Sequence, residues 1–161
     1  MFVIYNFFLS LIIFISPLII LIRIFLGKED QNRFKEKYGF LAKNNNSNEV
    51  VWIHGASVGE ILSIIPIIKK FEKDKKIKRI LITSSTTSSS QILSKFRFKK
   101  TIHQFYPFDL NFLTKHFINH WKPKLAIFVD SEIWPNMFNN LHKQNIPLIL
   151  LLSLIHISEP T

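Results

Sequence analysis

Residues 50–60 read Val-Val-Trp-Ile-His-Gly-Ala-Ser-Val-Gly-Glu, and the predicted fold class follows from this stretch. Its first part, Val50–His54, is an apolar run with the length of a buried strand. Gly55 and Gly59 follow in a turn where the backbone can approach other atoms closely, and a helix-like pattern then continues to Phe71. A strand, a tight turn and a helix in this order are the start of a βαβ unit, which is typical of α/β proteins with a parallel sheet.

The same alternation continues through the rest of the chain. Five apolar runs rich in Val, Ile and Leu predict strands at Val50–His54, Arg79–Thr83, Ile102–Tyr106, Leu125–Val129 and Pro147–Leu152. Helical patterns separate them at Val58–Phe71, Ser88–Phe96, Leu110–His120 and Pro135–Gln144. The sequence therefore predicts one α/β domain over residues 49–152. Ligands of such sheets bind beyond the carboxyl ends of the strands, so candidate site residues are expected in the loops that follow them.

Composition limits the possible partners without selecting one. The 161 residues leave room for one domain of ordinary size besides an apolar N-terminal segment. The 21 Lys and Arg against 11 Asp and Glu give a net charge of +10, which fits nucleic acid, anionic lipid or a phosphorylated substrate. There is no Cys, which excludes disulfides, thiolate metal sites and a Cys nucleophile.

The N-terminal segment predicts a membrane anchor. Phe2–Ile22 contains no charged residue, and a helix of that length crosses a hydrocarbon layer of about 30 Å. The basic residues that follow it are Arg23, Lys28, Arg33, Lys35 and Lys37. The positive-inside rule therefore predicts a single-pass anchor over residues 1–26 with the rest of the chain in the cytoplasm, and a basic segment and linker over 27–48 that could bind anionic lipid. The alternative is a buried helix of a soluble protein.

The loop after the first predicted strand contains a candidate general base. Ser57 and Glu60 have the Ser-x-x-Glu spacing of a capping box, in which both side chains bond backbone N–H groups at a helix start. Spacing alone favours this structural role. The functional alternative is that Glu60 takes a proton from an acceptor hydroxyl while N–H groups at the same helix start bind an anion.

The loop after the second predicted strand is a row of hydroxyl residues. Thr83–Ser90 includes Ser84 and Thr86, which could bind sugar or phosphate oxygens at a helix start. The alternative is a flexible loop in which one serine caps the helix.

The loop after the fourth predicted strand is acidic. Asp130 and Glu132 stand just before Trp134, and two carboxylates beside an aromatic face can bind a sugar. They would also be favoured there by the dipole of the following helix. His103 and Asp109 are both expected to be structural, Asp109 as a helix cap.

Taken together, these features resemble the 3-deoxy-D-manno-octulosonic acid (Kdo) transferases of lipopolysaccharide synthesis. The matching motifs, besides the apolar segment, are WIHGASVGE at 52–60, TSSTTSS at 83–89, HQFYPFD at 103–109, HWKPKLAIFVDSEIWPN at 120–136 and NIPLILL at 145–151. The resemblance extends to about Leu152. It implies the N-terminal, acceptor-side, Rossmann-like domain of a GT-B glycosyltransferase, preceded by one transmembrane helix.

The resemblance also implies an activity and a site. Such enzymes move Kdo from CMP-Kdo to a lipid A precursor with inversion, at the bacterial inner membrane, and the residue matching their proposed base is Glu60. The expected substrate-binding residues are Ser57, Gly59, Ser84, Thr86, Asp130 and Glu132. Asp130 stands where the family usually has glutamate. The expected partners are the lipid A precursor, CMP-Kdo and anionic membrane lipid, with no cofactor, no metal and no nucleic acid.

The resemblance further implies a second domain that binds most of the nucleotide sugar, so this chain alone is expected to be inactive. Residues 153–161 depart from the family pattern and are expected to be a non-native tail. The alternative function is a non-catalytic, membrane-tethered module that binds anionic lipid or RNA.

Overall fold

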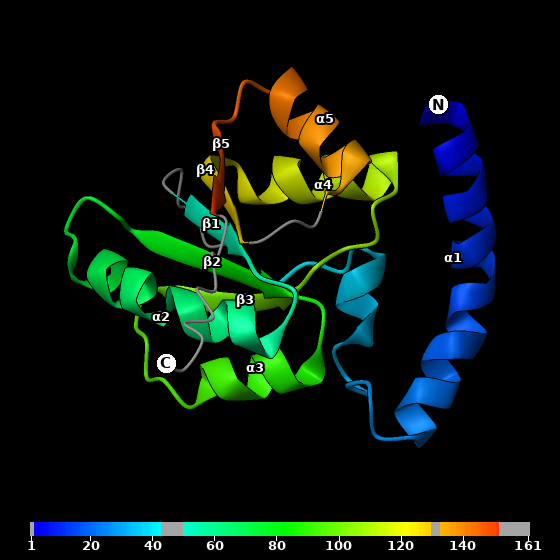
Figure 1. Ribbon diagram of the computed structural model, residues 1–161, viewed down its shortest axis with the longest axis horizontal. Coiled ribbons are helices and arrows are strands. Elements are labelled where there is room, and N and C mark those ends of the chain that lie inside the picture. Colours follow the sequence, from blue (N-terminus) through cyan, green and yellow to red (C-terminus); the bar gives the residue numbers. More distant parts are fainter. Residues whose placement is uncertain (1, 43–49, 130–132, 152–161) are drawn as a thin grey trace, which may run out of the picture.

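A parallel sheet forms the centre of the computed structural model, which describes residues 2–42, 50–129 and 133–151 (Figure 1). The strands are β1 (Val50–His54), β2 (Arg79–Ser84), β3 (Thr101–Phe105), β4 (Pro123–Val129) and β5 (Leu148–Leu151). Their order is β3-β2-β1-β4-β5, and every neighbouring pair is parallel. The chain reverses its direction of travel through the sheet at β1. In such sheets the ligand crevice lies at the carboxyl ends of the strands beside this reversal.

Two pairs of helices cover the two faces of the sheet. The helices are α2 (Val58–Lys73), α3 (Thr87–Ser94), α4 (Asn111–Trp121) and α5 (Pro135–Lys143). Figure 1 shows α2 and α3 on one face and α4 and α5 on the other. The predicted α/β fold with a parallel sheet is therefore confirmed.

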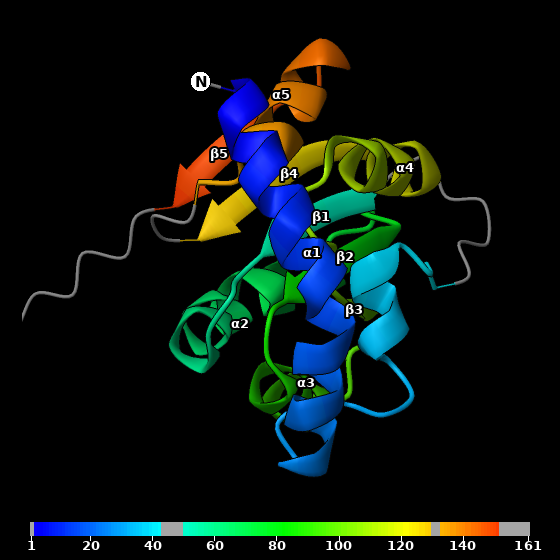
Figure 2. The same ribbon diagram turned by 90° about the vertical axis from the view of Figure 1, so that its right-hand side faces the viewer.

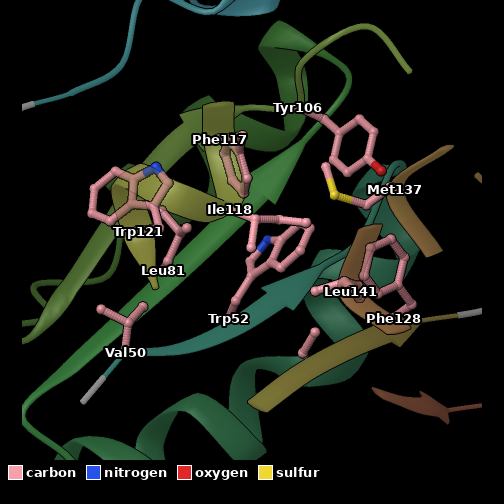
Figure 3. Close-up of a cluster of buried hydrophobic side chains, with 11 residues drawn as sticks. Val50, Trp52, Leu81, Tyr106, Phe117, Ile118, Trp121, Phe128, Met137 and Leu141 are labelled. Atoms are coloured by element: carbon pink, nitrogen blue, oxygen red, sulfur yellow. The ribbon is translucent and has the colours of Figure 1, made fainter. Parts of the chain in front are cut away.

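Alternate residues of β1 serve two separate hydrophobic cores. Ile53 faces α2 and packs with Ile61, Ile64 and other aliphatic side chains. Trp52 faces the opposite way and packs in an aromatic core under α4 and α5 (Figure 3). Successive side chains of a strand point to opposite faces, so one apolar run fills both layers.

Residues 27–42, the described part of the predicted basic segment and linker, are attached to the domain. This part follows the N-terminal helix. It contains a short 3-10 helix, η1 (Phe34–Tyr38), which ends at Gly39 in the left-handed conformation. The N–H of Phe105 donates to Oε2 of Glu36 at 2.7 Å, and the N–H of Phe108 donates to the carbonyl of Lys37 at 2.9 Å. These bonds join η1 to the end of β3 and to the loop beyond it.

Three of the basic residues that could bind lipid are engaged within the protein, and one of them is Arg23, which pairs with Glu29 at 3.3 Å. Arg33 forms an ion pair with Glu36 at 2.7 Å, and Lys37 forms one with Glu29 at 2.9 Å. Lys28 and Lys35 remain exposed. Arg33 also donates to the carbonyl of His103 at 2.9 Å, so the basic segment serves partly to attach η1 to the domain.

The N-terminal helix α1 (Phe2–Phe25) lies alongside the domain (Figures 1 and 2). By length and composition its stretch Val3–Phe25 could cross a membrane. Only 11% of its most apolar window is buried against the protein, so most of its side chains face outward.

Candidate functional site

A tight turn joins β1 to α2 at the carboxyl edge of the sheet. The N–H of Gly55 donates to the carbonyl of Thr83 at 3.1 Å, and the N–H of Ser85 donates to the carbonyl of Ala56 at 3.4 Å. The turn is thereby bonded to the end of β2. A Cβ atom on Gly55 would lie 3.3 Å from Cβ of Glu60, so glycine allows the turn to approach the first turn of α2.

Glu60 forms the expected capping box in a modified form. Ser57 Oγ accepts from the N–H of Glu60 at 3.3 Å, while Oε2 of Glu60 accepts from the N–H of Ala56 at 2.8 Å, one residue before the cap. The Ser57 hydroxyl also donates to Oε1 of Glu60 at 2.7 Å. Each carboxylate oxygen can accept two hydrogen bonds, so this fixed, half-buried carboxylate keeps acceptor capacity on both oxygens. Capping and proton abstraction are therefore compatible at this residue.

The surface beside Glu60 is open. Ser57 and Gly59 are exposed, and a Cβ atom on Gly59 would meet nothing closer than Ser57 Oγ at 4.0 Å. A ligand could thus approach the backbone of the first turn of α2 without displacing protein atoms.

The hydroxyl residues after β2 have structural roles in the chain as it stands. Thr86 is the N-cap of α3, and its Oγ1 accepts from the N–H of Ser89 at 3.2 Å. Ser84 is fully buried, and its Oγ lies 2.8 Å from Nε2 of His103. The structure therefore brings Thr86 to the edge beside the Gly55 turn but places Ser84 beneath it.

His103 is held in a neutral form. Arg33 Nη2 lies 3.0 Å from Nδ1 of His103, and because a guanidinium can only donate, Nδ1 must accept and the proton is on Nε2. The Nε2–H then donates to Ser84. Burial, together with the charge of Arg33, lowers the pKa of His103 to about 3. These bonds explain the structural role expected for His103.

Aromatic rings gather at the same edge of the sheet. The ring centroids of His54 and Tyr106 are 4.2 Å apart, and those of Tyr106 and Trp134 are 5.0 Å apart. Nε1 of Trp134 is buried and has no hydrogen-bond partner within the described ranges. Sequence reasoning singled out Trp134 but not His54 or Tyr106, although both belong to the quoted motifs and directly end or follow strands.

The acidic pair Asp130 and Glu132 lies outside the described residues. Val129, which ends β4, and Ile133 stand on either side of that pair and are described. Because β4 is paired with β1, its carboxyl end lies at the same edge as the Gly55 turn.

Asp109 caps a helix, but a different one from the helix that follows it. The cap position of α4 is Leu110, which makes no side-chain bond. Asp109 instead accepts from the N–H groups of Asn136 at 2.9 Å and Met137 at 2.8 Å, at the start of α5. Burial raises the pKa of Asp109, and the hydrogen bonds it accepts act in the opposite direction. The carboxylate thus connects the loop after β3 to the helix that follows the acidic pair.

Comparison with known proteins points to one family. The family model described as 3-deoxy-D-manno-octulosonic-acid transferase (kdotransferase) matches residues 32–155. A 3-deoxy-D-manno-octulosonic acid transferase of Rickettsia bellii is 40% identical over 140 residues, which cover 87% of this chain and 34% of the relative. The Haemophilus influenzae enzyme of that name is 30% identical over 148 residues, covering 89% and 35%. A probable mitochondrial one of Arabidopsis thaliana is 31% identical over 151 residues, covering 92% and 34%. The chain spans about a third of the length of these curated relatives.

Proposed function

The chain belongs to the 3-deoxy-D-manno-octulosonic acid (Kdo) transferase family, and we propose that it forms the acceptor-side part of a glycosyltransferase that moves Kdo from CMP-Kdo to a lipid A precursor. The complete reaction is proposed for the full-length protein, because the match covers only 34% of the Rickettsia bellii relative, which is named as a transferase. One observation carries the proposal. The carboxylate of Glu60 is fixed at the carboxyl edge of the sheet by Ala56 and Ser57, beside the open surface at Gly59.

Glu60 is the general base in this scheme. It takes the proton of an acceptor sugar hydroxyl while the hydroxyl oxygen forms a bond to the anomeric carbon of Kdo. The bond from that carbon to the phosphate oxygen of CMP breaks on the opposite side, and CMP leaves with the electron pair. The anomeric configuration is inverted, and charge develops as in an oxocarbenium-like transition state.

The other expected residues have different parts in the scheme. Ser57, Gly59 and Thr86 contact the acceptor around the first turns of α2 and α3, and the pair Asp130 and Glu132 contributes from the loop after β4. Ser84 acts indirectly, since its hydroxyl is bonded to His103.

Membrane attachment through α1 places the domain on the cytoplasmic side of the bacterial inner membrane. The apolar length of α1 and the net charge of +10 support this, because a positively charged domain is attracted to anionic lipid and to a phosphorylated lipid acceptor. A non-catalytic module that binds lipid or RNA would also carry such a charge. It would not require the fixed carboxylate of Glu60.

The reaction itself tests the proposal. The full-length protein is reconstituted in phospholipid vesicles with CMP-Kdo and a lipid A precursor, and the acceptor is analysed by mass spectrometry. We expect a gain of one or more Kdo residues that requires the donor and releases CMP. An acceptor that stays unmodified by active, folded protein would count against the assignment.

A further inference from the structure

The first two turns of α1 are bonded to the domain through polar side chains. The Tyr5 hydroxyl donates to Oδ2 of Asp109 at 2.8 Å, and Nδ2 of Asn136 donates to Oδ1 of Asn6 at 2.8 Å. We call these four residues the N-terminal latch. Asp109 belongs to the loop after β3, and Asn136 to the first turn of α5, the helix that follows β4, so the latch joins the start of α1 to the carboxyl edge of the sheet.

Further contacts follow along the same side of α1. Ser16 Oγ and the Tyr38 hydroxyl lie 2.7 Å apart near the middle of the helix. Nε of Arg23 donates to Oε2 of Glu29 at 3.3 Å near its end. The same side of α1 is therefore bonded to other parts of the chain near the start, the middle and the end of the helix. Figure 2 shows this helix running across the front of the domain.

These contacts are difficult to reconcile with a helix that crosses the bilayer. Tyr5 and Arg23 are 18 residues apart, which a helix covers in about 27 Å, close to the thickness of the hydrocarbon layer. If Arg23 stood at the cytoplasmic surface, Tyr5 and its partner Asp109 would stand near the opposite one. The polar ends of α4 and α5 would then lie within hydrocarbon, where unpaired backbone and charged groups are costly.

The outward side of α1 is a continuous apolar surface. Phe7 is 68% exposed, Phe14 is 85% exposed and Phe25 is 90% exposed. No charged side chain interrupts this side between Val3 and Ile22. Exposed lysines, Lys28 and Lys35, follow the helix, where they can meet lipid phosphates. Acyl chains are therefore the occupant that the surface fits, with phosphates beside its basic end.

We propose that α1 lies in the plane of the membrane, with its outward side among the acyl chains of the cytoplasmic leaflet and its latch side against the domain. High apolarity alone favours a crossing helix, but the bonds of Tyr5 and Asn6 to the domain, together with the contact of Ser16 with η1, favour the in-plane arrangement. The carboxyl edge of the sheet is then held at the bilayer surface, where the sugar of a lipid acceptor projects. The inference rests on the membrane placement proposed above and is independent of the reaction.

Spin labels measure the orientation directly. The chain contains no Cys, so Val3→Cys, Phe14→Cys and Phe25→Cys each add a single label site to it. Each is made in the full-length protein, with any cysteine elsewhere replaced by serine, and is placed in nanodiscs of phosphatidylethanolamine and phosphatidylglycerol. Collision with oxygen and with a water-soluble nickel chelate then reports depth.

We expect the three labels at similar depths, about 5–10 Å below the phosphates. A label at Phe14 near the bilayer centre, with those at Val3 and Phe25 near opposite surfaces, would establish a crossing helix and overturn the proposal. Low oxygen access at all three positions would show that another part of the protein or a second copy covers α1, which overturns it as well.

A second measurement uses cells. A membrane-impermeant maleimide added to intact spheroplasts should leave Val3→Cys unlabelled, as it should a domain control, Lys75→Cys. Both should be labelled after detergent is added. Labelling of Val3→Cys in intact spheroplasts, with the control still protected, would place the N-terminus outside and refute the in-plane arrangement.

Discussion

Glu60 can have two roles, helix capping and proton abstraction, which the spacing of Ser57 and Glu60 alone presents as alternatives. Its carboxylate accepts from Ala56 and Ser57 and so caps α2, yet it retains lone pairs on both oxygens. A fixed base loses less conformational entropy when the acceptor binds, which is the benefit of orientation in catalysis. The cap is therefore part of the proposed mechanism.

The two glycines of the turn make a matched test. Gly59→Ala adds a methyl group in open space on a helix, so it should leave stability unchanged or raise it by up to about 1 kcal/mol. If the acceptor passes there, kcat/KM for transfer by the full-length protein should nevertheless fall at least tenfold. Gly55→Ala places its methyl group 3.3 Å from Glu60 Cβ and Ile61 Cδ1, so it should lower thermal stability, by about 1–3 kcal/mol. Full activity of Gly59→Ala would remove the support for an acceptor beside that residue.

The lowered pKa of His103 predicts that the local stability of β3 depends on pH. Its pKa is about 3 in the folded chain and 6.5 unperturbed, so the unfolded form binds a proton that the folded form excludes. The stabilisation is complete above pH 6.5 and is lost as the pH falls toward 3. Between pH 7 and pH 5 the free energy of opening of β3, measured by hydrogen exchange, should fall by at most about 2 kcal/mol. The variant His103→Gln should remove most of this pH dependence, and an equally steep dependence in that variant would contradict the assignment.

At the scale of elements, Asp109 connects three parts of the chain. It lies in the loop after β3, caps α5 through the N–H groups of Asn136 and Met137, and receives the Tyr5 hydroxyl of α1. The loop with the acidic pair ends where α5 begins. The position of the start of α5 therefore depends on Asp109, which precedes Asn136 by 27 residues in the sequence.

Two variants, Asp109→Ala and Tyr5→Phe, should distinguish the stabilising effect of the helix cap from that of the bond to α1. Asp109→Ala leaves two N–H groups of α5 without their acceptor and should lower the free energy of unfolding by about 1–3 kcal/mol. Tyr5→Phe removes only the bond to α1, so denaturant unfolding of the domain should change by less than about 1 kcal/mol. If both variants unfold alike, the bond to α1 accounts for the effect and the cap does not.

The helices and strands of the domain could be predicted from local sequence patterns, whereas the bonds between elements that are far apart in the sequence could not. Apolar runs and 3.6-residue periodicity identified every strand of the sheet and every helix that covers it, because each buries a whole face. Some observed helix boundaries differ from the predicted ones because a capping side chain determines where the helix begins. Helix α3 begins at Thr87 and not at the predicted Ser88, because Thr86 caps it. Helix η1 was missed because its supporting bonds, such as Glu36 to the N–H of Phe105, join residues far apart in the sequence.

In the candidate site, too, local contacts could be predicted from the sequence and long-range contacts could not. The Ser57 and Glu60 pair is local, so its capping geometry could be predicted from spacing. The burial of Ser84 against His103 could not, since it depends on β2 and β3 being neighbours. Asp109 was predicted as a helix cap, but its helix, α5, could not be predicted, because α5 comes near Asp109 only in the folded chain.

At the scale of the whole molecule, the start of α1 and the candidate site lie at the same edge of the sheet. The latch residues Asp109 and Asn136 follow β3 and β4, and Glu60 follows β1, so all belong to the carboxyl edge of one sheet. This arrangement fits an acceptor that stays in the membrane while its sugar is modified. Among the described residues, no candidate catalytic group lies at the opposite, amino edge of the sheet. A substitution at that edge can therefore serve as a control for one at the candidate site.

That control is Glu72, near the other end of α2. Its carboxylate accepts from the N–H groups of Lys99 and Lys100 and from the Thr101 hydroxyl, and these bonds lower its pKa against the opposing effect of burial. Glu72→Gln therefore changes a hydrogen-bonded carboxylate of the same helix at the amino edge. It should affect stability modestly and the rate of transfer hardly at all.

The most direct measurement is the single-turnover rate of Kdo transfer by full-length protein carrying Glu60→Gln, compared with Glu72→Gln and the parent. Glutamine can still accept from Ala56 and keep the turn, but it cannot take the acceptor proton. The rate of Glu60→Gln should fall at least about 100-fold with an unchanged thermal midpoint, while Glu72→Gln stays near the parent rate. A rate for Glu60→Gln within tenfold of the parent would contradict the assignment of Glu60 as the base.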